Sequence, residues 1–150
     1  MVNLSKFAER LDELIFEQSL QQKTDAKTLA GRLGLQGSTI TRYLRAEREP
    51  TVKNLVLLAD YFQCSTDFLL GRESNNSVRT FTPSPPFSEQ LCKVLNRFGY
   101  SCYRFSLEAN VHQSIVYAWK SGKRLPSLDN VVKMAEFFDC SVDLILGREK

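Results

Sequence analysis

The sequence predicts an all-α protein of two tandem five-helix domains joined by a Pro- and Ser-rich linker. Three observations predict this fold. The chain contains an internal repeat, each copy has apolar residues at helical spacing, and a polar segment with three prolines separates the copies. We expect domain 1 over residues 1–73, the linker over 74–86 and domain 2 over 87–150.

The repeat is clearest in the last third of each half. Residues 50–73 and 126–149 are identical at 12 of 24 aligned positions, where chance would give about one or two. Their offset of 76 residues is too long for one unit of a solenoid and suits a small domain. Domains of about 65–70 residues bury only about 60% of their unfolded surface, so each copy should be compact and helical.

In the first copy, apolar residues at helical spacing from Leu4 to Ile15 predict a first helix. Thr24 or Asp25 can cap the second helix, Thr51 the fourth and Ser65 the fifth. The second helix should end at Gly34, which is free to take a positive φ. The expected later helices cover residues 26–33, 37–46, 51–62 and 65–71.

The second copy follows the same plan, with its first helix marked by Phe87, Leu91, Val94 and Leu95. These residues match the first copy at an offset of 80, whereas later positions match at 76. The first copy therefore has four extra residues between its first two helices. The expected later helices cover residues 102–109, 113–121, 127–138 and 141–146.

Composition narrows the functional classes. The net charge is +3. Residues 1–73 carry ten basic and ten acidic side chains, and residues 74–150 carry ten and seven. No apolar run approaches the ~18 residues of a membrane span, and the N-terminus has no signal-peptide core, so we expect a cytoplasmic protein. Four cysteines without CxxC spacing and a single histidine make a zinc site improbable and favour buried thiols. We expect no cofactor, metal or small-molecule ligand.

Two helices joined by a tight turn, followed by a basic loop, indicate a helix-turn-helix reader of DNA. This geometry needs a small residue where the third helix crosses the second, met by Ala30 and Ser106. Four residues later it needs a positive φ, which Gly34 and Asn110 permit. Core anchors are expected in both copies: Leu29, Leu33, Ile40 and Tyr43, and their counterparts Phe105, Ala109, Val116 and Trp119. Both copies meet every requirement in register.

At these residues a family resemblance becomes plain. Residues 29–35, 38–44 and 58–72 resemble the phage lambda repressor/Cro-type regulators, most closely the xenobiotic-response-element branch found in bacteria. The resemblance covers nearly the whole chain outside the linker. It implies a five-helix fold whose third helix enters the major groove of double-stranded DNA.

Carried over by position, the resemblance gives base-facing candidates on each third helix, and the basic residues on or after that helix are candidates for phosphate or base contact. Gln113 keeps the family's frequent adenine-reading glutamine, whereas Gly37 replaces it in copy one. His112 either touches DNA or is a plain surface residue, and Tyr117 either contacts the groove or packs. The candidates are Ser38, Thr39, Thr41, Arg42, Arg45 and Arg48, and then His112, Gln113, Ser114, Tyr117, Lys120, Lys123 and Arg124.

Two further features leave alternatives open. Aromatic residues at positions 98, 100 and 103 either cover an interface or fill the shorter helix connection of copy two. The ends of the copies, residues 67–70 and 143–146, are more apolar than a short terminal helix needs. Because related repressors often dimerise through this region, a homodimer is possible.

The sequence favours a DNA-binding transcription regulator with two non-equivalent readers in one chain, and the resemblance implies a repressor. A 13-residue linker has a root-mean-square reach of roughly 20 Å and a maximum near 45 Å, so half-sites about 34 Å apart are within reach. The alternative is a protein-interaction module, such as an antirepressor or antitoxin, in which one copy is a partner surface. An enzyme is not expected, because neither paired carboxylates nor a phosphate-binding loop is present. The expected location is the bacterial or phage-infected cytoplasm, at the nucleoid.

Overall fold

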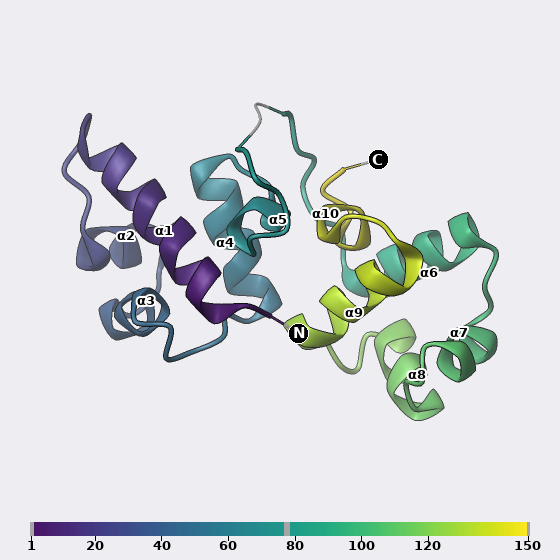
Figure 1. The fold of residues 1–150 in the computed structure, drawn as a ribbon. Coiled ribbons are helices and arrows are strands. Elements are labelled where there is room, and N and C mark those ends of the chain that lie inside the picture. Colours follow the sequence, from purple (N-terminus) through teal and green to yellow (C-terminus); the bar gives the residue numbers. More distant parts are fainter. Residues whose placement is uncertain (1, 77–78, 150) are drawn as a thin grey trace. The chain divides into compact units, whose positions relative to one another are not determined.

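The structure, a computed structural model, describes residues 2–76 and 79–149, and these contain helices and no strand (Figure 1). The prediction of an all-α fold is confirmed. By their internal contacts the residues divide into one unit over Val2–Thr80 and a second unit from Phe81 onward. The first unit contains α1 (Leu4–Ser19), α2 (Ala26–Leu33), α3 (Gly37–Leu44), α4 (Val52–Phe62) and α5 (Thr66–Leu69).

The second unit repeats this order of helices. It contains α6 (Phe87–Phe98), α7 (Cys102–Glu108), α8 (Gln113–Ser121), α9 (Leu128–Phe138) and α10 (Val142–Leu146). The positions predicted for α2 and α8 agree with the structure. The main differences lie at the first and last turns, where α3 ends two residues early and α5 is a single turn.

Side-chain caps explain why the helices begin where they do. The Thr51 hydroxyl accepts a hydrogen bond from the Asn54 N–H at 3.1 Å, and Ser127 does the same for Asn130 at 3.2 Å. Of the two candidates for α2, Asp25 is the cap, accepting from the Thr28 N–H at 2.7 Å. Each cap satisfies a backbone donor that has no partner within its helix.

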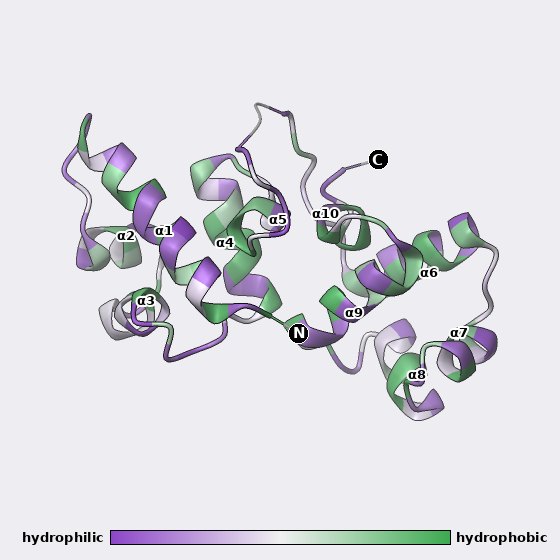
Figure 2. Ribbon diagram, viewed as in Figure 1, coloured by the Kyte–Doolittle hydropathy of each residue, from purple (hydrophilic) through white to green (hydrophobic). Residues whose placement is uncertain are grey.

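Each unit buries one apolar face of every long helix around its own core, as the colouring of the ribbon shows (Figure 2). The rings of Phe7 and Tyr43 meet edge to face at 5.6 Å, and those of Phe87 and Trp119 meet in the same way at 6.0 Å. Tyr43 and Trp119 are each 1% exposed, so their predicted role as core anchors is confirmed.

The two units use different side chains to pack the connection between their first two helices, α1–α2 in the first unit and α6–α7 in the second. In the first unit the Tyr61 hydroxyl donates to Gln18 Oε1 at 2.9 Å and accepts from Arg32 at 2.8 Å. In the second unit Phe98 occupies the position of Gln18 and stacks on Phe138 at 4.5 Å. Tyr100 also packs edge to face on Phe138 at 5.5 Å. Phe98 and Tyr100 therefore fill the shorter connection, whereas Tyr103 is 54% exposed and does not.

Part of the predicted linker is packed against the second unit. We call residues 81–86 the arm. Thr82 N–H donates to the Arg148 carbonyl at 2.9 Å, the Thr82 hydroxyl donates to the Gly147 carbonyl at 2.9 Å, and Ser84 donates to the Leu146 carbonyl at 2.5 Å. The guanidinium of Arg148 lies 4.4 Å from the Phe81 ring centroid. The arm thus satisfies carbonyls that the end of α10 leaves without helical partners.

Two expectations about side-chain burial need correction. Only Cys64 of the four free cysteines is buried, and Cys92, Cys102 and Cys140 are partly exposed. The apolar residues at the ends of the units form no surplus surface, because α5 and α10 bury theirs within their own units. The terminal helices therefore offer little apolar area for a dimer.

Candidate nucleic-acid interface

The helix-turn-helix of the first unit is formed by α2 and α3, which pack against each other. Gly34 ends α2 with a φ of 70°, as predicted from its position in the turn. Its N–H bonds back to the helix, and the Leu35 N–H reaches the Ala30 carbonyl at 2.8 Å. Ala30 is 1% exposed, so it supplies the small residue that close helix packing needs. The turn thus lets α3 pack on α2 while the outer face of α3 lies in solvent.

The second unit builds the same motif from α7 and α8 with other residues. Asn110 takes a φ of 56°, and the Val111 N–H bonds to the Ser106 carbonyl at 3.0 Å. Ser106 is 5% exposed and its hydroxyl is turned inward, donating to the Tyr103 carbonyl at 2.6 Å. The prediction that Asn110 replaces glycine at this turn is confirmed.

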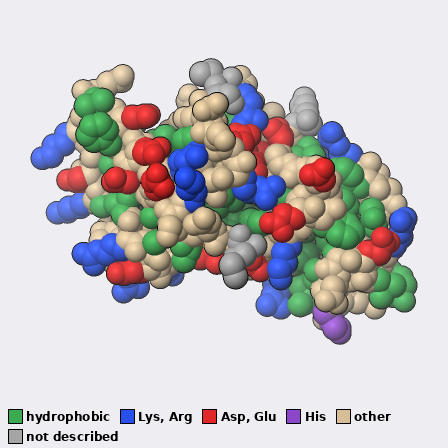
Figure 3. All heavy atoms as spheres, viewed as in Figure 1, with side chains coloured by type: hydrophobic (Ala, Val, Ile, Leu, Met, Phe, Trp, Pro, Cys, Tyr) green, Lys and Arg blue, Asp and Glu red, His purple; other side chains and the backbone are tan. Residues whose placement is uncertain are grey.

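On α3, Ser38 and Arg42 are exposed, whereas Thr39 and Thr41 are half-buried. The Thr41 hydroxyl donates to the Gly37 carbonyl at 3.0 Å, so its hydrogen is used within the helix. Arg45 and Arg48 follow α3 and are exposed. None of the three arginine side chains forms an ion pair with another residue of the described part. Figure 3 shows Lys and Arg side chains gathered around α2 and α3.

On α8, Gln113, Ser114 and Lys120 are exposed, and Tyr117 is 42% exposed, so its ring does not belong to the core. Lys123 and Arg124 lie in the exposed loop after α8. As in the first unit, these basic side chains make no ion pair within residues 2–76 and 79–149. An open hollow is lined by residues 114, 117, 118, 120, 121 and 123 along the outer side of α8.

His112 has a role that its sequence position did not reveal. Its Nδ1 accepts from the Ser114 N–H at 3.2 Å and lies 2.8 Å from the Ser114 hydroxyl. The imidazole therefore caps α8 in place of the Ser or Thr that is frequent there in the resembled family. Gln36, the equivalent residue before α3, makes no side-chain cap. A histidine before a helix is too ambiguous a signal to have predicted this.

Comparison with known proteins agrees with this geometry. A helix-turn-helix family model matches residues 17–69 and again residues 93–145. The chain belongs to this family. The family resemblance predicted from the sequence is confirmed.

Three similar proteins are also named as helix-turn-helix transcriptional regulators. A Bacillus subtilis protein, the uncharacterised helix-turn-helix transcriptional regulator YqaE, is 33% identical over 76 residues, which are 51% of this chain and 59% of that protein. Uncharacterised helix-turn-helix transcriptional regulators of Rickettsia prowazekii and Rickettsia conorii are each 31% identical over 81 residues, covering 51% of this chain and 87% and 73% of theirs. The match to YqaE thus spans well under two thirds of that protein. No solved structure matches the chain significantly.

Among the residues that the structure describes, no helix is long and apolar enough to cross a membrane.

Proposed function

We propose that the protein is a sequence-specific transcription regulator, a repressor in its simplest form, that acts on DNA in the cytoplasm. In this proposal residues 1–73 and 87–150 are two readers, and α3 and α8 each enter a major groove of double-stranded DNA. The observation that carries it is the set of basic side chains on or after these helices. They are exposed and have no ion partner among the described residues, so their charge is available to bind phosphate.

The two readers touch DNA with different chemistry. In the first, Ser38, Thr39 and Arg42 face the bases, and Arg42 can bond the O6 and N7 acceptors of guanine. Thr41 can only accept a hydrogen bond from a base, because its hydroxyl donates to Gly37. In the second, base contact falls to Gln113, Ser114 and Tyr117. Gln113 can bond adenine, and the Tyr117 ring offers apolar contact to a thymine methyl group.

Phosphate contact in this proposal falls to six basic residues and one histidine. A Lys or Arg beside a recognition helix binds the backbone without reading sequence. His112 contributes its ring edge next to the start of α8, while its Nδ1 stays on Ser114. The proposed phosphate-binding residues are Arg45, Arg48, Lys120, Lys123, Arg124 and His112, with Arg42 serving either role.

The connection between the readers is shorter than the 13-residue linker suggests. Thr82 and Ser84 are bonded to the end of α10, so the arm moves with the second reader. Residues 74–81 then span at most about 28 Å, and Arg79 bonds to the Glu73 carboxylate at 2.5 and 2.7 Å. We infer that the readers bind half-sites at one closely fixed spacing and that tethering raises the effective concentration of the second reader.

Salt dependence tests this proposal. Binding of the full chain to a mixed-sequence duplex is measured by fluorescence anisotropy over a range of salt concentrations. Each phosphate contact contributes about 0.9 to the slope of log affinity against log salt. Replacing Arg42, Arg45 and Arg48 with Ala should lower the slope by about two to three, and so should replacing Lys120, Lys123 and Arg124 with Ala.

The matched control is Lys133→Ala, which removes an exposed lysine paired with Asp129 on α9. It should leave the slope unchanged. An unchanged slope for the second triple variant would show that the second unit does not touch DNA, and it would favour the protein-interaction alternative for that copy.

A further inference from the structure

Two large apolar side chains at the C-terminal end of α1, Phe16 and the C-cap residue Leu20, are left uncovered by the first unit. Phe16 is 63% exposed and Leu20 is 72% exposed. Because they are four residues apart, they lie next to each other on one face of the helix. Asp12, Glu13 and Glu17 are exposed around them, and none of the three pairs with another described residue. Figure 3 shows acidic side chains gathered over α1.

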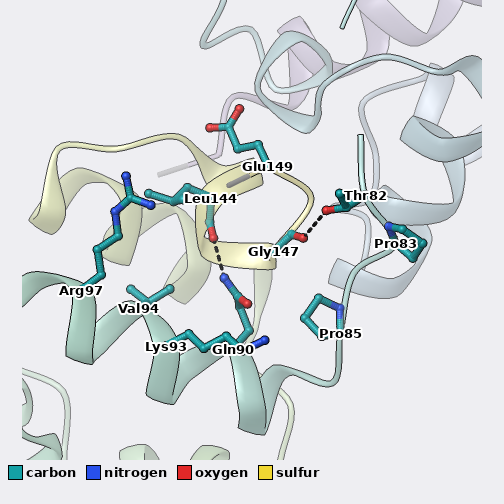
Figure 4. A pocket seen from close by; sticks show the side chains of 10 residues that line it. All are labelled: Thr82, Pro83, Pro85, Gln90, Lys93, Val94, Arg97, Leu144, Gly147 and Glu149. Atoms are coloured by element: carbon teal, nitrogen blue, oxygen red, sulfur yellow. Dashed lines mark hydrogen bonds between the residues drawn. The ribbon is translucent and has the colours of Figure 1, made fainter. Parts of the chain in front are cut away.

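The second unit contains a groove of about 560 Å³ between the arm, α6 and α10 (Figure 4). Val94 of α6, Leu144 of α10 and Pro85 of the arm contribute apolar wall. Lys93 and Arg97 lie at its edge, four residues apart on α6. Both are exposed and have no ion partner in the described part of the chain. The other charge lining the groove, Glu149, is held by the Ser141 hydroxyl.

At two positions around the groove, smaller side chains stand where the first unit has larger ones. In the first unit the Arg10 guanidinium lies 4.2 Å from the Phe68 ring centroid and donates to the Phe68 carbonyl at 3.3 Å. In the second unit Gln90 and Leu144 stand at these positions. Gln90 donates to the Leu144 carbonyl at 2.9 Å, which preserves the bond but fills less space.

The charges on the two faces are opposite at equivalent positions. Glu13 of α1 corresponds to Lys93 of α6, and Glu17 corresponds to Arg97, at the offset of 80. The acidic face carries exposed apolar anchors and the basic face borders an apolar groove. We propose that the Glu13–Leu20 face of α1 in one copy of the protein docks into the α6–α10 groove of a second copy.

This contact is a helix in a groove, with Phe16 and Leu20 as anchors at positions i and i+4. Glu13 and Glu17 pair with Lys93 and Arg97 at the rim, which fixes the partner and orientation more than it adds affinity. Each copy carries one face and one groove, so one contact of this kind joins two copies. A dimer of this kind brings four readers to one DNA region.

Sedimentation equilibrium of the full chain without DNA, from about 1 to about 100 μM, tests the proposal. We expect a reversible dimer that weakens as salt is raised. Replacing both Phe16 and Leu20 with Ser should raise the dimer dissociation constant at least about tenfold. Both side chains are exposed, so the fold should not change.

A charge swap makes the test specific. Glu13→Lys with Glu17→Arg should weaken the dimer about tenfold or more, and so should Lys93→Glu with Arg97→Glu. Combining all four changes should restore association, because the complementary charges return in exchanged positions. The matched control, Lys53→Glu with Lys133→Glu, changes the net charge as much on exposed residues elsewhere and should leave the dimer intact.

Three results would overturn the proposal. The first is a chain that stays monomeric at about 100 μM, as it would if the face docked into the groove of its own chain. The second is a dimer that is unaffected by either charge reversal, Glu13→Lys with Glu17→Arg or Lys93→Glu with Arg97→Glu, because another surface would then form the dimer. The third is that Lys93→Glu with Arg97→Glu lowers DNA affinity and leaves dimer formation unchanged, because these residues would then contact phosphate. In each case the salt dependence of DNA binding tests the DNA-binding proposal separately.

Discussion

Four residues other than glycine take a positive φ among those described, and each lies at the end of a helix or the turn after it. They are Ala46, Gln63, Asn110 and Asp139. Ala46 is the least suited to this conformation, because it has a Cβ atom and no side-chain polar group to bond locally. The equivalent residue of the second unit is Gly122, with a φ of 79°.

Exchanging these two residues should have opposite effects on stability. Ala46→Gly relieves the backbone strain and should raise the free energy of unfolding of the first unit by up to about 1 kcal/mol, while Gly122→Ala should lower that of the second by about 1 kcal/mol. Urea unfolding checks both, with circular dichroism for the first change and the fluorescence of Trp119, the sole tryptophan, for the second. A loss of stability in Ala46→Gly would contradict the account.

The Asp25 cap should make the first unit sensitive to acid. The hydrogen bond from the Thr28 N–H favours the carboxylate and holds the pKa of Asp25 below its ordinary value. Since the folded pKa is depressed, the stabilisation is complete above the unfolded pKa and is lost as pH falls through the folded pKa.

Asp25→Asn keeps a capping oxygen and removes the titration. Unfolding of this variant should therefore depend less on pH in acid, below the ordinary pKa of an aspartate, than unfolding of the natural chain does. Urea titrations at several pH values give the comparison. Identical pH profiles would show that the Asp25 charge does not stabilise α2.

At the level of elements, the two units differ most where the first helix meets the second. The first unit uses four extra residues and a polar network around Tyr61, and the second uses a stack of aromatic rings around Phe138. Phe138 is 9% exposed, whereas its equivalent Phe62 is only half-buried. The second unit therefore depends more on this one apolar position.

Phe138→Ala should lower the free energy of unfolding of the second unit by about 3–5 kcal/mol, which is a large part of a small domain's stability. Phe62→Ala should cost the first unit clearly less. Trp119 fluorescence follows the former and circular dichroism the latter. Equal losses at the two positions would contradict the difference in packing.

Local signals in the sequence were enough to predict most helices. Ser, Thr and Asp caps, turn residues with a positive φ and apolar spacing act over a few residues, so Thr51, Asn110 and Trp119 could be assigned without coordinates. The arm could not be predicted in the same way. One of its hydrogen bonds joins Thr82 to Gly147, 65 residues away. A polar, proline-rich segment has the sequence pattern of a linker whether or not it forms such distant bonds.

The candidate interface was predictable in its position and less so in its details. The family pattern places α3 and α8, and the repeat confirms their register. Which side chains are free was not visible in the sequence: Thr41 bonds within its helix and His112 caps α8. Such roles depend on rotamers that neighbouring backbone atoms select, and residue type alone does not specify them.

At the level of the whole molecule, the repeat preserves its scaffold and changes its contact surfaces. Helices α4 and α9 begin with equivalent caps and pack in equivalent cores. The recognition helices instead carry Gly37 against Gln113, and Arg42 against Ala118. We therefore propose that one chain holds two readers of different sequence preference.

The decisive experiment is selection of bound sequences from random duplex DNA with the intact chain. We expect enriched sites with two unlike half-sites at one fixed spacing. We also expect that Arg42→Ala relaxes the preference in one half-site and Gln113→Ala in the other, since each change removes one base-reading side chain. Recovery of two identical half-sites, of a single half-site or of no enriched sequence would contradict this proposal.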